Sequence, residues 1–311
     1  MSKHIPVLLN ETIDGLNIKP NGVYVDLTLG RGGHSREILK RLKKGHLIVF
    51  DKDQTAIEES EENLKGFDAK ITTIHDDFRN FRSHLTKLGI LKVDGIMADL
   101  GVSSPQFDDA SRGFSYKEEA RLDMRMNKEQ PFSAYELINS YSLNDLTKIF
   151  REYGEDKFAY QIAKNIVKIR EQKPIETTTE LVEIIKMSKP QKELMKKGHP
   201  AKQIFQAIRI EVNDELGALK CALADALDVL NVGGRAAFIT FHSLEDRLVK
   251  NAFNEVSKVE GSRHNVFSLP TEEDLPSYKL VNSKVIIASE EEMEENPRSK
   301  SAKLRIIEKV K

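Results

Sequence analysis

The amino-acid sequence predicts an α/β fold, a largely parallel sheet interrupted after its fourth strand by a helical insertion. The first observation is that four aspartates recur every 22 to 26 residues, each at or near the end of a short apolar run: Asp26, Asp51, Asp77 and Asp99. That interval accommodates one strand and one helix, the period of a parallel βαβ sheet. The second observation is that this pattern stops after Leu100 and resumes only near residue 209.

The expected elements of the first part follow in chain order. Strands are expected at the four apolar runs, 23–25, 47–50, 71–74 and 93–100. Ile38, Leu39 and Leu42 share one helical face after the first run, and a second helix is expected from about 54 to 64. Within the insertion, helical periodicity occupies 134–138, 143–153, 158–170, 179–186 and 203–210. Residues 177–180 offer hydroxyl caps for the fourth of these helices.

The sheet pattern then returns with a helix that starts near Glu215 and stops at Gly233-Gly234. A strand over 235–241 and a helix over 244–256 follow, and two late runs, 284–288 and 303–307, are expected to form an antiparallel pair. The acidic run between them, 290–295, reads as a solvated connection. We therefore expect one domain made of residues 1–108 and 209–311, with residues 109–208 as the inserted helical domain.

The composition limits the class of protein. The chain has 311 residues, of which 39% are hydrophobic and 31% charged, as in soluble globular proteins. No apolar stretch approaches the roughly 18 residues of a membrane span, and we expect no membrane association. The single cysteine, Cys221, excludes an internal disulfide and fits the reducing cytoplasm. The cysteine and the histidines show no metal-ligand spacing, so no metal is expected.

The charge is balanced overall, and any contact with nucleic acid must therefore be local. The net charge is −1, which excludes a general polyanion binder. Two basic patches stand out: residues 186–202, with six lysines against the single acid Glu193, and residues 298–305, with Arg298, Lys300, Lys303 and Arg305. Each patch is explained either by a solvated lysine-rich face or by contacts with RNA phosphates.

A glycine-rich turn, Gly30-Arg31-Gly32-Gly33, follows the first predicted strand. A dinucleotide site needs the pattern G-x-G-x-x-G, but Ser35 stands where the third glycine is required. Residues 26–32 instead read D-x-x-x-G-x-G, the first motif of S-adenosylmethionine-dependent methyltransferases. The pattern favours a methyl donor over a nicotinamide cofactor.

Two further positions suit the same cofactor. Asp51, at the end of the second predicted strand, is placed to accept hydrogen bonds from ribose hydroxyls. Asp77 and Phe78 follow the third strand, where a phenyl face can cover adenine and a carboxylate can accept from its amino group. Asp99 ends the fourth strand at the same edge of the sheet, where ligands bind in parallel α/β folds.

Eight stretches now point to one family. They are HIPVLLNE at 4–11, DLTLGRGGHS at 26–35, FDKD at 50–53, ADLGVSSPQ at 98–106, RGFS at 112–115, LDMRM at 122–126, FHSLEDR at 241–247 and NPRSKSAKLR at 296–305. In these stretches, which run nearly end to end in the family's order, the chain resembles the 16S ribosomal RNA (cytosine-N4)-methyltransferases. The resemblance implies a Rossmann-like class I methyltransferase sheet with a helical insertion domain after the fourth strand.

The resemblance also implies an activity, a cofactor and a set of site residues. The activity is methyl transfer from S-adenosylmethionine to N4 of a cytosine in the P-site region of small-subunit rRNA, by a cytoplasmic enzyme acting on that RNA or on a 30S particle. A homodimer is compatible with it. By motif position, the residues implied to bind the cofactor are Gly32, Gly33, His34, Asp51, Phe78, Asp99 and Gln106. The insertion would then be the RNA-recognition domain.

Asp99 is the expected catalytic residue, with two roles left open. A cytosine amine is a poor nucleophile because its lone pair is delocalised into the ring, so a hydrogen-bond acceptor on its N–H groups would assist the transfer. Asp99 either accepts from this amine or only holds the ammonium group of the donor. The aromatic that stacks on the base is also open, among Phe107, Phe114 and Tyr116. His242 either touches substrate or is a structural histidine.

Two other classes of function remain as alternatives. One is a non-catalytic RNA-binding ribosome assembly factor that retains the cofactor fold, which the four strand-end acids argue against. The other is a methyltransferase or dehydrogenase for small molecules, which the large insertion with basic patches argues against.

Overall fold

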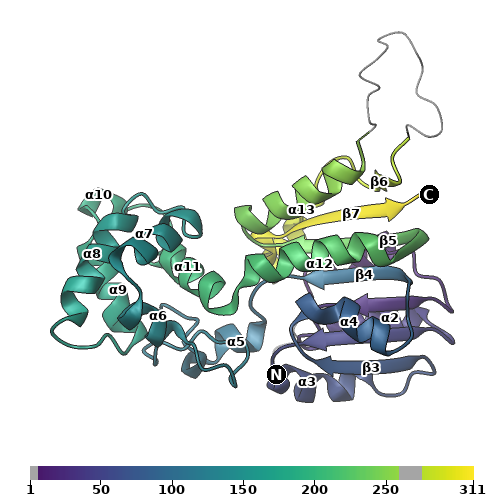
Figure 1. Cartoon of the computed structure of the whole chain (residues 1–311), viewed down its shortest axis with the longest axis horizontal. Coiled ribbons are helices and arrows are strands. Elements are labelled where there is room, and N and C mark those ends of the chain that lie inside the picture. The colour runs from purple at the N-terminus through teal and green to yellow at the C-terminus, as the bar shows by residue number, and fades with distance from the viewer. Residues whose placement is uncertain (1–5, 259–274) are drawn as a thin grey trace, which may run out of the picture. The chain divides into compact units, whose positions relative to one another are not determined.

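The computed structural model describes residues 6–258 and 275–311, so His4 and Ile5 of the first family stretch lie outside the described residues. The chain divides into two compact units, Met1–Gly101 with Gly217–Lys311, and Val102–Leu216. We call them the sheet unit and the helical unit (Figure 1). The division lies several residues outside the 109–208 expected from periodicity. The reason is that Val102 and Phe107 already pack against the core of the helical unit.

The sheet unit contains a seven-stranded sheet in the order β3-β2-β1-β4-β5-β7-β6. All its strands are parallel except β7, which runs antiparallel to both β5 and β6. This arrangement confirms the predicted class I methyltransferase sheet. The strands are β1 (Val23–Asp26), β2 (His46–Asp51), β3 (Lys70–His75), β4 (Val93–Asp99), β5 (Leu230–Thr240), β6 (Tyr278–Leu280) and β7 (Lys303–Lys309).

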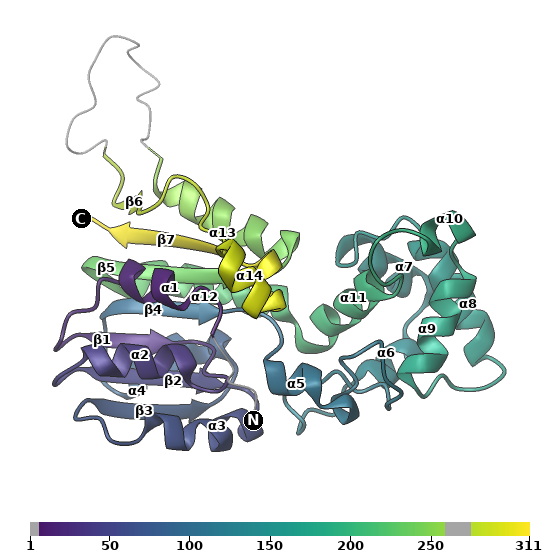
Figure 2. The same ribbon diagram turned by 180° about the vertical axis from the view of Figure 1, so that it is seen from behind.

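Helices cover both faces of the sheet because the strand residues alternate between two apolar cores. Ile48 and Phe50 of β2 belong to the core shared with α4, α12 and α13, whereas Leu47 and Val49 belong to the core shared with α1, α2 and α3 (Figures 1 and 2). The helices are α1 (Leu9–Gly15), α2 (Gly33–Arg41), α3 (Gln54–Ser60), α4 (Phe81–Lys87), α12 (Glu215–Val229), α13 (Ser243–Val256) and α14 (Glu290–Glu295), with short 3₁₀ turns η1 (Glu61–Leu64), η2 (Phe78–Asn80) and η4 (Pro297–Ser301).

One expectation for the C-terminal part is wrong, and another is confirmed only at a single residue pair. The acidic run 290–295 is the helix α14, capped by the side chain of Ser289, and Glu292 accepts a 2.8 Å hydrogen bond from the backbone N–H of Leu8. The late run 303–307 does form a strand, but it pairs with β5 and β6. From the run 284–288 only Ile286 forms a bridge, to Leu304.

The helical unit has its own core, in which residues such as Leu137, Phe150 and Ile185 are fully buried. The predicted cap is confirmed: Thr177 and Glu180 form a reciprocal capping box at the start of α9. The elements are α5 (Ser104–Asp108), η3 (Ala110–Arg112), α6 (Ala134–Ser140), α7 (Leu143–Glu152), α8 (Ala159–Arg170), α9 (Thr178–Met187), α10 (Gln191–Leu194) and α11 (Lys202–Asn213). Across the described ranges of the chain, no helix combines the length and the apolar character that a membrane span requires.

Candidate functional site

Three of the predicted acids end adjacent strands of the sheet. Asp26 ends β1, Asp51 ends β2 and Asp99 ends β4, and these strands are parallel neighbours in the order β2-β1-β4. Because the carboxyl ends of parallel strands meet at one edge, the three carboxylates gather there. The acidic cluster predicted from the spacing therefore exists.

The glycine turn between β1 and α2 brings the backbone close to this edge. Gly32 caps α2 in the left-handed region with φ of 73°. A Cβ added to Gly33 would lie 2.3 Å from Cγ of Pro6, so a side chain there would displace the neighbouring segment. Glycine is thus required at Gly32 by its backbone conformation and at Gly33 by the close approach of Pro6.

Asp51 ties the end of β2 to this turn. Its Oδ2 accepts a 2.9 Å hydrogen bond from the N–H of Gly30, and its Oδ1 accepts a 2.9 Å bond from the N–H of Asp53. Burial raises the pKa of this carboxyl above its ordinary value. Each carboxylate oxygen keeps a further lone pair, and a ribose with two hydroxyls can donate to them.

Asp26 has a supporting position beneath the turn. It is fully buried, accepting from the Ser35 hydroxyl at 2.6 Å and from the N–H of Thr28 at 3.0 Å. Burial raises its pKa to about 6. Its bonds hold the start of α2 against β1, and the same residue adds negative charge beneath the site.

Asp99 differs from Asp26 and Asp51 in having a carboxylate oxygen without any hydrogen bond among the described residues. Its backbone N–H donates to Thr28 Oγ1 at 2.6 Å, but its side-chain Oδ1 is buried without a hydrogen-bond partner among the described residues. Burial, followed by the charges of Asp26 and Glu245, raises the pKa of Asp99 to about 8. A buried acceptor left unpaired in this way costs free energy until a donor reaches it.

His34 faces the other oxygen of Asp99. Its Nε2 lies 3.0 Å from the carbonyl oxygen of Val7, which can only accept, so Nε2 carries the ring proton. Nδ1 then has a lone pair and lies 3.8 Å from Asp99 Oδ2. The ring is nine-tenths buried at the start of α2.

Phe78 lies in η2, at the end of the sheet formed by β3 and β2, with Lys52 Nζ 6.0 Å from its ring centroid. The neighbouring Asp77 does not offer a free carboxylate for adenine, because its Oδ2 is paired with Lys52 at 3.1 Å and with Arg79 at 3.2 Å. Asp77 is therefore committed to two cations, of which Lys52 is the one near the Phe78 ring.

Gln106 is the one predicted cofactor residue outside the sheet unit. It lies on α5 of the helical unit, it is buried, and its Oε1 accepts a 3.1 Å hydrogen bond from the N–H of Ser103. The other six, Gly32, Gly33, His34, Asp51, Phe78 and Asp99, belong to the sheet unit.

Two residues beside Asp99 have larger roles in the structure than the sequence indicates. Glu245 is 2% exposed and accepts from the N–H of Phe241 at 2.8 Å, while His242 caps α13 in a capping box with Glu245. A polar residue followed three positions later by Glu is a sequence signal for a helix start. Histidine in place of Ser or Thr at the cap conceals that signal here.

Of the three aromatic residues considered for stacking on the target base, one is excluded by its position in the helical unit. Phe114 is buried in the core and unavailable to a base. Tyr116 stacks on His199 with ring centroids 4.4 Å apart, and Phe107 packs partly against the core.

The basic patches are less uniform than the sequence suggests. Lys189 is buried and paired with Asp156, and Lys186 and Lys196 pair with Glu183 and Glu193. Lys192, Lys197 and Lys202 are exposed and form no ion pair with any described residue. In the C-terminal patch, Lys303 and Arg305 both bind Asp246.

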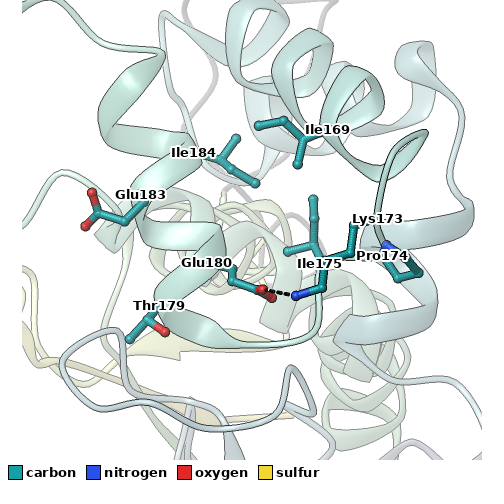
Figure 3. A pocket seen from close by; sticks show the side chains of 8 residues that line it. All are labelled: Ile169, Lys173, Pro174, Ile175, Thr179, Glu180, Glu183 and Ile184. Carbon is teal, nitrogen blue, oxygen red and sulfur yellow. Dashed lines mark hydrogen bonds and ion pairs between the residues drawn. The ribbon is translucent and has the colours of Figure 1, made fainter.

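A pocket of about 400 Å³ lies within the helical unit, between the end of α8 and the start of α9 (Figure 3). Ile169, Ile175 and Ile184 line it, and an ion pair of 2.9 Å between Lys173 and Glu180 borders it. None of the predicted site residues lines this pocket.

Comparisons with known proteins agree along the whole chain. A family model described as the MraW methylase family matches residues 1–310. The proteins named Ribosomal RNA small subunit methyltransferase H from Streptococcus dysgalactiae subsp. equisimilis and from Streptococcus pyogenes serotype M4 are each 54% identical over 311 residues, covering 99% of this chain and 98% of theirs. A solved structure of a rRNA methylase from Streptococcus thermophilus aligns over 99% of this chain and 100% of its own, with 12% identity and a TM-score of 0.42, a likeness too weak to bear on function.

Proposed function

The chain belongs to the MraW methylase family, and from this membership we propose that it methylates the exocyclic N4 of a cytosine in the P-site region of small-subunit rRNA. It is a methyltransferase with S-adenosylmethionine as its cofactor. The names of the relatives support a ribosomal RNA substrate, as free RNA or within a 30S particle. A cytoplasmic location belongs to the same proposal.

The observation that carries the proposal is the unpartnered Oδ1 of Asp99 within a cluster of buried acids. Burial, followed by the negative charges of Asp26 and Glu245, raises the pKa of Asp99. Such a site favours a cationic ligand, because positive charge relieves the repulsion. S-adenosylmethionine carries a sulfonium and an ammonium group, whereas the pyrophosphate of a dinucleotide would add negative charge.

The residues of the sheet unit support this cofactor. The backbone of Gly32 and Gly33 would lie against its methionine part, and Asp51 would accept from the ribose hydroxyls. Phe78 would cover the adenine. S-adenosylmethionine supplies an electrophilic methyl group, so the protein must activate the amine rather than the donor.

We assign that activation to Asp99. With S-adenosylmethionine bound, Asp99 would accept a hydrogen bond from the cytosine amine and then take the proton that N4 loses on methylation. His34 lies beside that carboxyl, with its Nδ1 3.8 Å from Asp99 Oδ2. A carboxylate of raised pKa suits this task, since a base close to the working pH takes a proton most effectively.

The direct test is methyl transfer in a purified system. Radiolabelled S-adenosylmethionine is incubated with 30S particles or 16S rRNA from cells that lack this gene, and the RNA nucleosides are analysed by mass spectrometry. N4-methylcytidine at a single P-site position is expected. A chain that binds the RNA and the cofactor but transfers nothing would instead be an assembly factor, and another methylated nucleoside would contradict the N4 assignment.

Replacing Asp51 with alanine is expected to weaken S-adenosylmethionine binding roughly ten- to a hundredfold, because a charge-assisted hydrogen bond of about 1.5–3 kcal/mol is removed. Isothermal calorimetry measures the effect, and Asp68→Ala, at an exposed aspartate of the same unit, is the matched control. Unchanged affinity in Asp51→Ala, or tight binding of NAD to the wild type, would contradict the cofactor assignment.

Replacing Lys192, Lys197 and Lys202 with glutamine is expected to weaken RNA binding. It should also reduce the slope of log affinity against log salt by roughly 0.7–0.9 for each phosphate that these lysines neutralise in the wild type. Filter binding over a range of salt measures this. The control changes three exposed lysines of the sheet unit, Lys43, Lys44 and Lys87. If both triple variants keep the wild-type slope, the lysines of the helical unit form only a solvated face.

A further inference from the structure

His242 lies at the same sheet edge as Asp99, one strand away. In the parallel pair β4–β5, Asp99 is in register with Ile239, and the chain leaves β5 after Thr240. A Cβ added to Gly101 would lie 3.6 Å from the ring of Phe241, which shows how closely the two strand ends run together. All these residues belong to the sheet unit.

The backbone of α13 determines which ring nitrogen of His242 carries the proton. Nδ1 lies 3.5 Å from the N–H of Glu245 and accepts from it as the helix cap. The Glu245 carboxylate in turn accepts from the N–H groups of Phe241 at 2.8 Å and His242 at 3.3 Å. With Nδ1 used as an acceptor, Nε2 is the protonated nitrogen of the neutral ring.

This Nε2–H has no hydrogen bond of its own. The side chain is 9% exposed, and Nε2 is buried without a hydrogen-bond partner among the described residues. Glu245 Oε1 lies 3.1 Å away as a charge partner, but the pair lacks hydrogen-bond alignment. A helix cap needs only Nδ1, so the cap does not account for a buried donor left unused.

We propose that His242 recognises the target base by donating from Nε2–H to ring nitrogen N3 while the adjacent amine faces Asp99. The two neighbouring strand ends present one unpaired acceptor, Asp99 Oδ1, and one unpaired donor, His242 Nε2, among the residues that the structure describes. Cytosine presents the complementary pair at N4 and N3. Uracil and guanine instead have a carbonyl oxygen and a ring N–H at these positions. An acceptor would then face Asp99 and a donor would face His242, so neither hydrogen bond could form. The inference rests on the proposed function and names what excludes uracil and guanine. Adenine presents the same pair at N6 and N1, so this pair of contacts does not exclude it.

The experiment separates capping from recognition. Asparagine is a strong helix cap, so His242→Asn keeps the bond to the N–H of Glu245 but has no donor that reaches as far as Nε2. We expect the melting temperature and the affinity for S-adenosylmethionine to be unchanged, with kcat/KM for the RNA lower by roughly ten- to a hundredfold. His242→Ser is a second capping variant, in case asparagine disturbs the loop.

A substrate change completes the cycle. In RNA with 3-deazacytidine at the target, a C–H replaces N3. On this RNA the wild type should lose as much kcat/KM as His242→Asn loses on normal RNA. The variant itself should lose little more when it is given the modified RNA. Full activity of a stable capping variant on normal RNA, or independent losses that multiply, would overturn the proposal. A wild type that forms no N4-methylcytidine would instead overturn the proposed function itself.

Discussion

Replacing Asp99 with asparagine is expected to lower methyl transfer roughly 10²–10⁴-fold while most of the cofactor affinity remains. Asparagine keeps the shape and one acceptor oxygen but cannot take the proton of the amine. Single-turnover rates at saturating S-adenosylmethionine and RNA measure the loss. Asp94→Asn is the matched control, since Asp94 lies at the opposite end of the same strand, paired with Lys19.

The pH dependence gives a second readout of the same substitution. Because burial and nearby acids raise the pKa of Asp99 to about 8, the proton-accepting form grows as pH rises towards that value. The wild-type rate should therefore rise with pH on its acid side. Saturation with the cationic cofactor should move this rise to lower pH, because positive charge favours the carboxylate.

In Asp99→Asn this acid-side rise should be absent. If affinity and turnover instead fall together, Asp99 serves only to hold the ammonium group of the donor. Near-normal methylation by the variant would remove Asp99 from catalysis altogether.

Replacing Lys189 with alanine is expected to destabilise the helical unit by about 3–5 kcal/mol, the typical cost of leaving one partner of a buried ion pair alone. Lys189 Nζ lies 2.5 Å from Asp156 Oδ2 and also donates to the carbonyl oxygen of Pro200 at 2.7 Å. Both side chains are almost fully buried, at 6% and 2% exposed. The lysine thus joins the segment after α9 to two loops of the unit.

Urea denaturation followed by circular dichroism measures this loss, and Lys192→Ala, three residues away and exposed, should change stability by less than about 0.5 kcal/mol. If both substitutions lowered the free energy of unfolding equally, the buried ion pair of Lys189 would contribute nothing to stability. RNA binding provides the contrast, because Lys192→Ala is expected to weaken it more than Lys189→Ala does.

The positions of the strand-end acids could be predicted because they depend on a local period. Each apolar run closes with an acid, and the βαβ rule brings the ends to one edge without knowledge of any contact. Asp26, Asp51 and Asp99 follow from that rule alone. His34 follows only from the family resemblance, because its role depends on the carbonyl of Val7 and on Asp99, both distant in sequence.

What could not be predicted depends on partners far apart in the chain. The run 290–295 reads as solvated because it is acidic, but acids in the first turn of a helix are favourable, and Glu292 is held by Leu8 from the other end of the sequence. Lys189 reads as a surface lysine because nothing near it in sequence indicates Asp156. Arg305 is likewise committed to Asp246 on α13.

The pairing of β4 with β5 has a consequence for biosynthesis. Asp99 and Ile239 are neighbours in the sheet, but the entire helical unit is translated between them. The nascent chain must therefore hold β4 without its partner while the insertion is synthesised, and only the final strand, β7, covers the far side of β5. Long-range pairing of this kind is slow, and exposed strand edges invite aggregation. Completion of the sheet beside Asp99 is thus among the last events of folding.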